Sequence, residues 1–184
     1  MHPQDIMQKF NINGTPIPNA GISFEELHKE GKGIHILGGS STVIYRRNEG
    51  KIELLFQQRS EKMLTNPGKW DIHGGYINLG ETPIDTVLRE VKEELDLDLN
   101  PEKLQFAFRL KQINEICSYY LYDITDENQE MHFVDGEAQA TKWVDFETFK
   151  YRKEEIGLKE PLLVNKFFFE LITFMLEQNG NLDK

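Results

Sequence analysis

Three glutamates, Glu90, Glu93 and Glu94, lie at positions i, i+3 and i+4 in a segment with the periodicity of a helix. These spacings place side chains on one helix face, with Cβ atoms roughly 5–6 Å apart. Three like charges repel, so the cluster lowers helix stability unless a cation offsets it. Gathered carboxylate oxygens suit a divalent cation such as Mg²⁺. Water molecules and phosphate oxygens typically complete the coordination shell of such an ion. A solvated acidic face is the alternative that charge spacing also explains.

The helix that carries these glutamates is expected over residues 82–96, with a defined start and a defined buried side. Thr82 is predicted as the N-cap, Pro83 occupies the first helical position, and Asp85 lies in the first turn, where the helix dipole favours negative charge. The buried side is predicted from apolar residues spaced three or four apart, namely Ile84, Val87, Leu88, Val91 and Leu95.

The rest of the chain predicts a small mixed sheet flanked by helices. Strands are expected at 40–46, 52–58, 104–112, 115–124 and 139–145, with a short strand around Trp70. Asn48-Glu49-Gly50 is expected to join the first two strands as a hairpin. An apolar helix over 161–178 either covers the sheet or also buries its remaining apolar face in a homodimer.

The sequence predicts that the chain consists of two segments. Residues 1–33 are expected to form an irregular N-terminal arm with a short helix at 23–31, because this stretch holds several Pro, Gly and Asn residues and no sustained period. Residues 34–184 are expected to form the folded domain, which includes the final helix.

The loop before the central helix carries a motif. Gly74 and Gly75, then Gly80, predict a loop in which backbone can approach a ligand without obstruction by side chains. The stretch that runs from this loop through the helix, GYINLGETPIDTVLREVKEELDL, resembles the sequence box of the Nudix hydrolase family. The matching positions are Gly75, Glu81, Arg89, Glu90, Val91, Glu93, Glu94 and Leu97. Asp96 departs, because the family has a glycine there, in a left-handed helix cap that Asp tolerates better than most residues.

This resemblance implies that the fold is an α/β/α sandwich with a mixed β-sheet. It also implies that the protein is a pyrophosphatase that uses Mg²⁺ or Mn²⁺. The resemblance also implies that Arg89 orients a glutamate through a charge-assisted hydrogen bond and that Glu81 fixes the loop. Catalysis would depend on Arg89 and on the metal-bound glutamates. The metal ligands that it implies are the Gly75 carbonyl and the carboxylates of Glu90, Glu93 and Glu94.

Four residues outside the box are further candidates. Glu137 precedes Trp143 by six positions, as an auxiliary glutamate does in Nudix hydrolases, and is expected to act as base or metal ligand unless it is an ordinary loop carboxylate. Glu115, two residues before the single cysteine, is a candidate metal ligand. Trp70 and Trp143 are either core residues or platforms for stacking a base.

The sequence before the box resembles the isopentenyl-diphosphate isomerase branch of the superfamily. His28 and His35 lie seven residues apart, and the phrase FQQRSEKMLTNPGKW follows. Those isomerases need a cysteine and a metal-binding histidine at the positions of Gly74 and Tyr76, which offer neither thiol nor imidazole. We therefore expect hydrolysis, with an isomerase-like enzyme as one alternative. The other alternative is a noncatalytic ligand-sensing Nudix domain, because one position of the box departs.

Composition limits the class of partner. The chain has 184 residues, with 21 Lys and Arg against 31 Asp and Glu, a net charge of −10. This excess disfavours a nucleic-acid polymer and favours a small-molecule diphosphate bound through cations. A nucleoside diphosphate derivative is preferred because aromatic rings are available for stacking. The single Cys117, the lack of a secretory signal pattern and the lack of a membrane-length apolar run predict a cytoplasmic protein without a membrane anchor.

Overall fold

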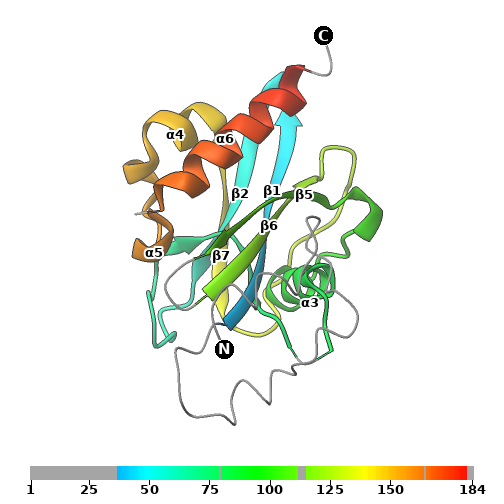
Figure 1. The fold of residues 1–184 in the computed structure, drawn as a ribbon. Coiled ribbons are helices and arrows are strands. Elements are labelled where there is room, and N and C mark those ends of the chain that lie inside the picture. Colours follow the sequence, from blue (N-terminus) through cyan, green and yellow to red (C-terminus); the bar gives the residue numbers. More distant parts are fainter. Residues whose placement is uncertain (1–36, 79, 112–114, 164, 182–184) are drawn as a thin grey trace.

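The computed structural model describes residues 37–78, 80–111, 115–163 and 165–181. Within this part of the chain the strands form one seven-stranded sheet (Figure 1). The strands are β1 (Leu37–Asn48), β2 (Lys51–Arg59), β3 (Trp70–Asp71), β4 (His73–Tyr76), β5 (Gln105–Lys111), β6 (Glu115–Asp123) and β7 (Ala138–Asp145). The helices are α3 (Pro83–Leu95), α4 (Phe146–Tyr151), α5 (Glu160–Leu163) and α6 (Lys166–Asn181), with 3-10 turns η1 (Pro101–Lys103) and η2 (Lys153–Ile156).

Strand β1 organises the sheet. It runs parallel to β6 and antiparallel to both β2 and β4, so the sheet is mixed. The strand order is β3-β2-β1-β6-β5, with β7 paired to β2 and β4 paired to β1. Residues 39–42 of β1 pair with β4, whereas residues 45–48 pair with β2. This division places β4, and the glycines that it carries, beside the middle of the sheet.

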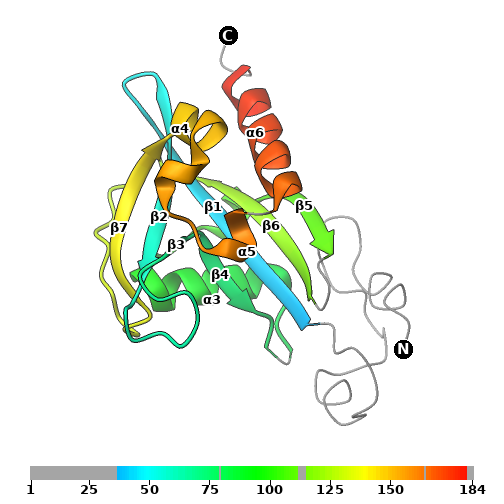
Figure 2. The same ribbon diagram turned by 90° about the vertical axis from the view of Figure 1, so that its left-hand side faces the viewer.

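Apolar side chains alternate along the strands and form two cores, one on each face of the sheet. One core joins the sheet to α4, η2, α5 and α6, and includes Val43, Phe56, Phe149, Phe168 and Ile172. The other joins the sheet to α3, and includes Ile44, Leu55, Val87, Val91 and Leu95. Figures 1 and 2 show α3 on the opposite side of the sheet from α4 and α6. The fold is therefore the expected α/β/α sandwich.

Helix α3 begins and ends as the sequence predicts. The Asp85 amide donates to the Thr82 side chain, and the Asp85 carboxylate accepts from the Thr82 amide, which closes a capping box. At the other end Asp96 adopts the left-handed conformation, with φ 59°, and its amide donates to the Lys92 carbonyl. Asp96 thus takes the conformation that the family's glycine is expected to take, and the departure in the box leaves the helix cap intact.

Two sequence-based expectations for local structure were wrong. Gly74 and Gly75 lie in strand β4 and not in a loop. Gly74 has φ 146°, and a Cβ there would overlap the Ser40 carbonyl oxygen and the Ser41 backbone of β1, so close strand approach requires glycine. The expected helix at 161–178 is two helices, because the Asn165 side chain accepts from the Phe168 amide and starts a new helix, α6.

Other expectations for the chain have mixed outcomes. The hairpin is confirmed, with positive φ at Glu49 and Gly50. The arm 1–33, with its expected helix, lies outside the described residues, as do His28 and His35. No helix in the described ranges combines the length and apolar character needed to cross a bilayer.

Candidate functional site

Arg89 is the centre of a hydrogen-bonded cluster on α3. Its Nε donates to Glu81 at 2.6 Å, and its Nη1 donates to Glu90 at 2.7 Å and to Glu93 at 2.9 Å. Its Nη2 also donates to the Tyr76 carbonyl at 3.0 Å. These bonds raise the pKa of Arg89, with the contact to Glu81 as the largest cause. Arg89 therefore neutralises part of the acidic face and ties α3 to the end of β4.

Glu81 fixes the segment between β4 and α3. Its carboxylate accepts from the Asn78 amide at 3.0 Å and from the Thr86 hydroxyl at 3.0 Å, in addition to Arg89. The hydrogen bond from Arg89 is the main reason that the pKa of Glu81 falls to about 2. All these donors stabilise the ionised carboxylate, so Glu81 holds the segment between β4 and α3 in place through hydrogen bonds.

Glu94 lies on the inner side of α3, where only 4% of its surface is exposed. Its Oε2 has no hydrogen-bond partner among the described residues. Burial raises the pKa of Glu94 well above its usual value, and the neighbouring charges of Glu90, Asp71 and Asp135 act in the same direction. Gln57 opposes these effects as a hydrogen-bond donor. A buried carboxylate surrounded by other carboxylates is stabilised by any cation that reaches it.

Glu90 lies directly against Gly75. A Cβ at Gly75 would overlap the Glu90 carboxylate, so glycine is what allows this carboxylate to approach β4. Burial raises the pKa of Glu90, Arg89 lowers it, and the charges of Glu93 and Glu137 raise it. Two carboxylates of α3, those of Glu90 and Glu94, are therefore held close to β4 in an environment of negative charge.

The three glutamates of the cluster do not share one environment, which corrects the expectation of a single converging face. Their side chains are 17%, 50% and 6% exposed for Glu90, Glu93 and Glu94. In the described part of the chain no three His, Cys, Asp or Glu side chains are gathered closely enough to hold a metal ion. The reason is visible in the contacts, because Arg89 draws Glu90 and Glu93 together while Glu94 turns toward the sheet.

The donor set nevertheless fits a divalent metal. Carboxylate oxygens are the ligands that Mg²⁺ and Mn²⁺ prefer. Glu94 has a buried oxygen without a partner, and Gly75 leaves room for the Glu90 carboxylate beside the β4 backbone. Glu90 and Glu94 are therefore the buried or partly buried carboxylates of α3 that could hold an ion, and Glu93 adds a more exposed one.

The loop before β7 brings two further carboxylates toward α3. Glu137 is exposed, and its negative charge raises the pKa of Glu90 across the site. Asp135 affects Glu94 in the same way, although the sequence analysis did not select it. Asp135 directly precedes Gly136, which has φ 78°, and this Asp-Gly turn was a signal in the sequence. Glu115 begins β6 opposite Leu37, and its side chain lies outside what the structure describes.

The two tryptophans pack as partly buried core residues. Lys142 Nζ lies 4.1 Å from the centre of the Trp70 ring, and the Arg46 guanidinium lies 4.1 Å from that of Trp143. Both rings also contact the apolar cores. One face of each ring is therefore covered by a cation. Tyr76, which follows Gly75 at the end of β4, is 53% exposed.

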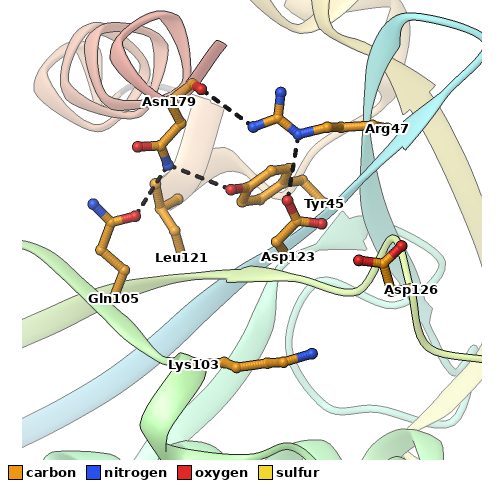
Figure 3. Close-up of a pocket in the computed structure, with 8 residues that line it drawn as sticks. All are labelled: Tyr45, Arg47, Lys103, Gln105, Leu121, Asp123, Asp126 and Asn179. Carbon is orange, nitrogen blue, oxygen red and sulfur yellow. Dashed lines mark hydrogen bonds and ion pairs between the residues drawn. The ribbon is translucent and has the colours of Figure 1, made fainter. Parts of the chain in front are cut away.

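A separate cavity of about 420 Å³ opens near the end of β1 that is distant from β4 (Figure 3). Most of its polar groups pair with one another, whereas Lys103 pairs with Glu127 outside the lining. Arg47 donates to the Asn179 carbonyl at 3.2 Å and lies 3.5 Å from Asp123, while the Asn179 amide donates to Gln105 and Tyr45. None of the glutamates of α3 lines this cavity, so it is separate from the carboxylate site.

Comparisons with known proteins agree with this fold. The profile of the NUDIX domain matches residues 38–164. A comparison with curated protein sequences gave no match. The NUDIX domain of Shewanella oneidensis NrtR, complexed with ADP ribose, is 15% identical with a TM-score of 0.58, and the alignment covers 99% of both chains. A C. elegans Ap4A hydrolase binary complex is 22% identical with a TM-score of 0.57, covering 79% of this chain and 99% of that one.

A third solved structure is larger. The bifunctional NMN adenylyltransferase/ADP ribose pyrophosphatase of Francisella tularensis, complexed with AMP and a Mn ion, is 17% identical with a TM-score of 0.59. The alignment covers 84% of this chain and 45% of that one, so this chain spans less than half of the Francisella enzyme. At these identities the three structures share the fold with this chain.

Proposed function

Because the chain belongs to the Nudix family, we propose that it hydrolyses a diphosphate linkage with Mg²⁺ or Mn²⁺. The observation that carries the proposal is the pair of carboxylates, Glu90 and Glu94, that α3 directs toward β4. Glu90 lies against this glycine, and Glu94 holds a buried oxygen without a partner one helical turn later. Both carboxylates have raised pKa values because burial and neighbouring negative charges disfavour ionisation, and a bound cation would reverse that effect.

Glu90, Glu94 and the Gly75 carbonyl would hold the ion, with Glu93 at its exposed side. A metal bound there would neutralise phosphate oxygens and lower the pKa of the attacking water. Arg89 keeps Glu90 and Glu93 adjacent, and Glu81 holds Arg89 in place. Glu137, exposed and facing Glu90 from the loop before β7, would accept the proton from the water.

The substrate class that we propose is a nucleoside diphosphate derivative. Two structural relatives carry ADP ribose or AMP, and a third is named as an Ap4A hydrolase. In this chain Tyr76, at the end of β4, carries an exposed aromatic ring that could stack a base. Trp70 and Trp143 serve this purpose less well, since a cation covers one face of each ring.

The geometry argues against the alternatives. An isomerase of the isopentenyl-diphosphate type requires a cysteine at Gly74, where even a Cβ would overlap the β1 backbone. A noncatalytic sensor was considered because Asp96 departs from the box, yet Asp96 closes the helix in the left-handed conformation. The structural reason for preferring a sensor is therefore removed, and turnover decides the question.

The test is a substrate panel with Mg²⁺ or Mn²⁺. The panel contains ADP-ribose, diadenosine tetraphosphate, nucleotide sugars and isopentenyl diphosphate, and products are separated by chromatography with phosphate release coupled to a phosphatase. We expect turnover of a nucleotide that EDTA abolishes and that Glu94→Gln lowers by about 100-fold or more. Glu170→Gln, at an exposed glutamate of α6, is the matched control and should retain activity.

Two other results would overturn the proposal. Conversion of isopentenyl diphosphate to its allylic isomer without phosphate release would establish an isomerase. Tight nucleotide binding without turnover of any compound would establish a sensor.

A further inference from the structure

Three buried polar side chains meet beneath α3. They are Gln57 of β2, His73 of β4 and Glu94 of α3, with 3%, 0% and 4% of their surfaces exposed. In the described part of the chain, Gln57 Oε1, both ring nitrogens of His73 and Glu94 Oε2 have no hydrogen-bond partner. Buried polar atoms without hydrogen-bond partners are rare in folded proteins. A group of them at one place therefore calls for a physical explanation, such as a bound ion or a role in the active site.

His73, like Gln57, is a member of this group that the proposed mechanism does not use. Its Nδ1 lies 3.9 Å from Glu94 Oε2, which is too long for a hydrogen bond and short enough for a small side-chain rotation to close. The Leu55 backbone also lies close enough to interact with the ring. An imidazole carries an N–H on at least one ring nitrogen and can therefore donate to a carboxylate.

We propose that His73 is a positioning residue for Glu94: its Nδ1–H donates to one lone pair of Oε2 and so fixes the direction in which the carboxylate meets a divalent cation. This inference rests on the proposed function. Gln57 acts as a donor to the same carboxylate from β2, so two strands flank Glu94 and fix its direction. Partners of this kind orient metal-binding carboxylates and tune their affinity for the ion.

Packing alone does not account for His73. Its site is fully enclosed, and an aliphatic side chain of similar volume would fill it without burying two unpartnered nitrogens. The ring lies near the Leu55 backbone and, at Nδ1, near the unpartnered oxygen of Glu94. A role in positioning Glu94 explains why a polar ring stands at this place in β4.

The test compares His73→Leu with His73→Asn. Leucine removes the donor, whereas the amide nitrogen of asparagine can occupy the position of Nδ1. Mn²⁺ affinity is measured by electron paramagnetic resonance of the free ion, without substrate. We expect His73→Leu to weaken Mn²⁺ binding by about 10-fold or more and to raise the Mn²⁺ concentration for half-maximal turnover by the same factor. His73→Asn should stay within about threefold of the wild type, as direct replacement of the donor requires.

The control is Tyr120→Phe, which removes a buried hydroxyl without a partner from the core that joins the sheet to α3. It should leave Mn²⁺ affinity unchanged, and thermal unfolding of all variants without metal reports folding separately. The inference is overturned if His73→Leu binds Mn²⁺ within twofold of the wild type, or if His73→Asn loses as much affinity as His73→Leu. A wild-type protein that binds no Mn²⁺ and turns over no diphosphate refutes the proposed function and this inference together.

Discussion

Substitution by alanine should have different effects at the two adjacent glycines of β4, Gly74 and Gly75. In Gly74→Ala the new Cβ meets backbone, namely the Ser40 carbonyl oxygen and Ser41 Cα, and φ is 146°. In Gly75→Ala the atoms nearest the new Cβ are those of the Glu90 carboxylate. Backbone cannot move without disturbing the β1–β4 pairing, whereas a glutamate side chain can rotate away. The first variant should therefore lose stability, and the second should lose function.

The magnitudes follow from these contacts. Steric overlap and strained φ together should cost Gly74→Ala about 3 kcal/mol in the free energy of unfolding, which lowers Tm by roughly 6–12 °C for a domain of this size. Gly75→Ala breaks the contact between Glu90 and Arg89, a partly exposed ion pair worth about 0.5–1 kcal/mol, or roughly 1–4 °C. Its Mn²⁺ affinity should fall by about 10-fold or more, because Glu90 no longer lies beside β4.

Both variants are assayed in the same two ways. Thermal unfolding without metal gives the stability change, and titration with Mn²⁺ gives the affinity of the folded fraction. Gly74→Ala with wild-type Tm would refute the argument from backbone overlap. Gly75→Ala with wild-type Mn²⁺ affinity would show that Glu90 does not bind the ion at this place.

Three further predictions concern other parts of the site. In metal-free protein, Glu94→Gln should raise the free energy of unfolding, measured with urea, by about 1–3 kcal/mol at pH 8 and by less near pH 5. The pKa of Glu94 is raised in the folded protein, so the stability that this residue contributes is present at low pH and is lost as pH rises. An equal gain at both pH values would contradict this argument. Arg89→Met should make acid unfolding, followed by circular dichroism, begin at higher pH. Arg89 lowers the pKa of Glu81 to about 2, so the stability that Glu81 contributes is lost as pH falls from about 4.5 toward that value. An unchanged acid midpoint would argue against a stabilising role for the hydrogen bond between Arg89 and Glu81. Asp96→Gly should change the free energy of unfolding by less than about 1 kcal/mol and leave turnover intact, whereas Asp96→Val should cost about 1–2 kcal/mol at the positive φ, and equal stability of the two would contradict the cap.

Local signals in the sequence were sufficient for helix α3 and for the layers of the fold. Thr82 and Pro83 define where the helix starts, and the apolar period defines which side is buried. The burial of Glu94 was also within reach, since it follows Val87 by seven residues and Val91 by three and so borders the apolar stripe. Charge spacing instead suggested that Glu94 shares an environment with Glu93.

Long-range contacts were what the sequence could not supply. Gly74 reads as a loop residue because glycine is common in turns, and the close approach of β1 that requires it involves residues more than 30 positions earlier. The effects of Asp135 and Glu137 on α3 depend in the same way on how the loop before β7 is placed. The contact between His73 and Glu94 depends on how β4 pairs in the sheet beneath the helix.

Anomalous scattering from crystals grown with Mn²⁺ and a non-hydrolysable nucleotide tests the metal assignment most directly. The structure predicts a peak within coordination distance of Glu90, Glu94 and the Gly75 carbonyl, with Arg89 still bonded to Glu81. A peak elsewhere, or Glu94 left without an ion beneath α3, would contradict the account.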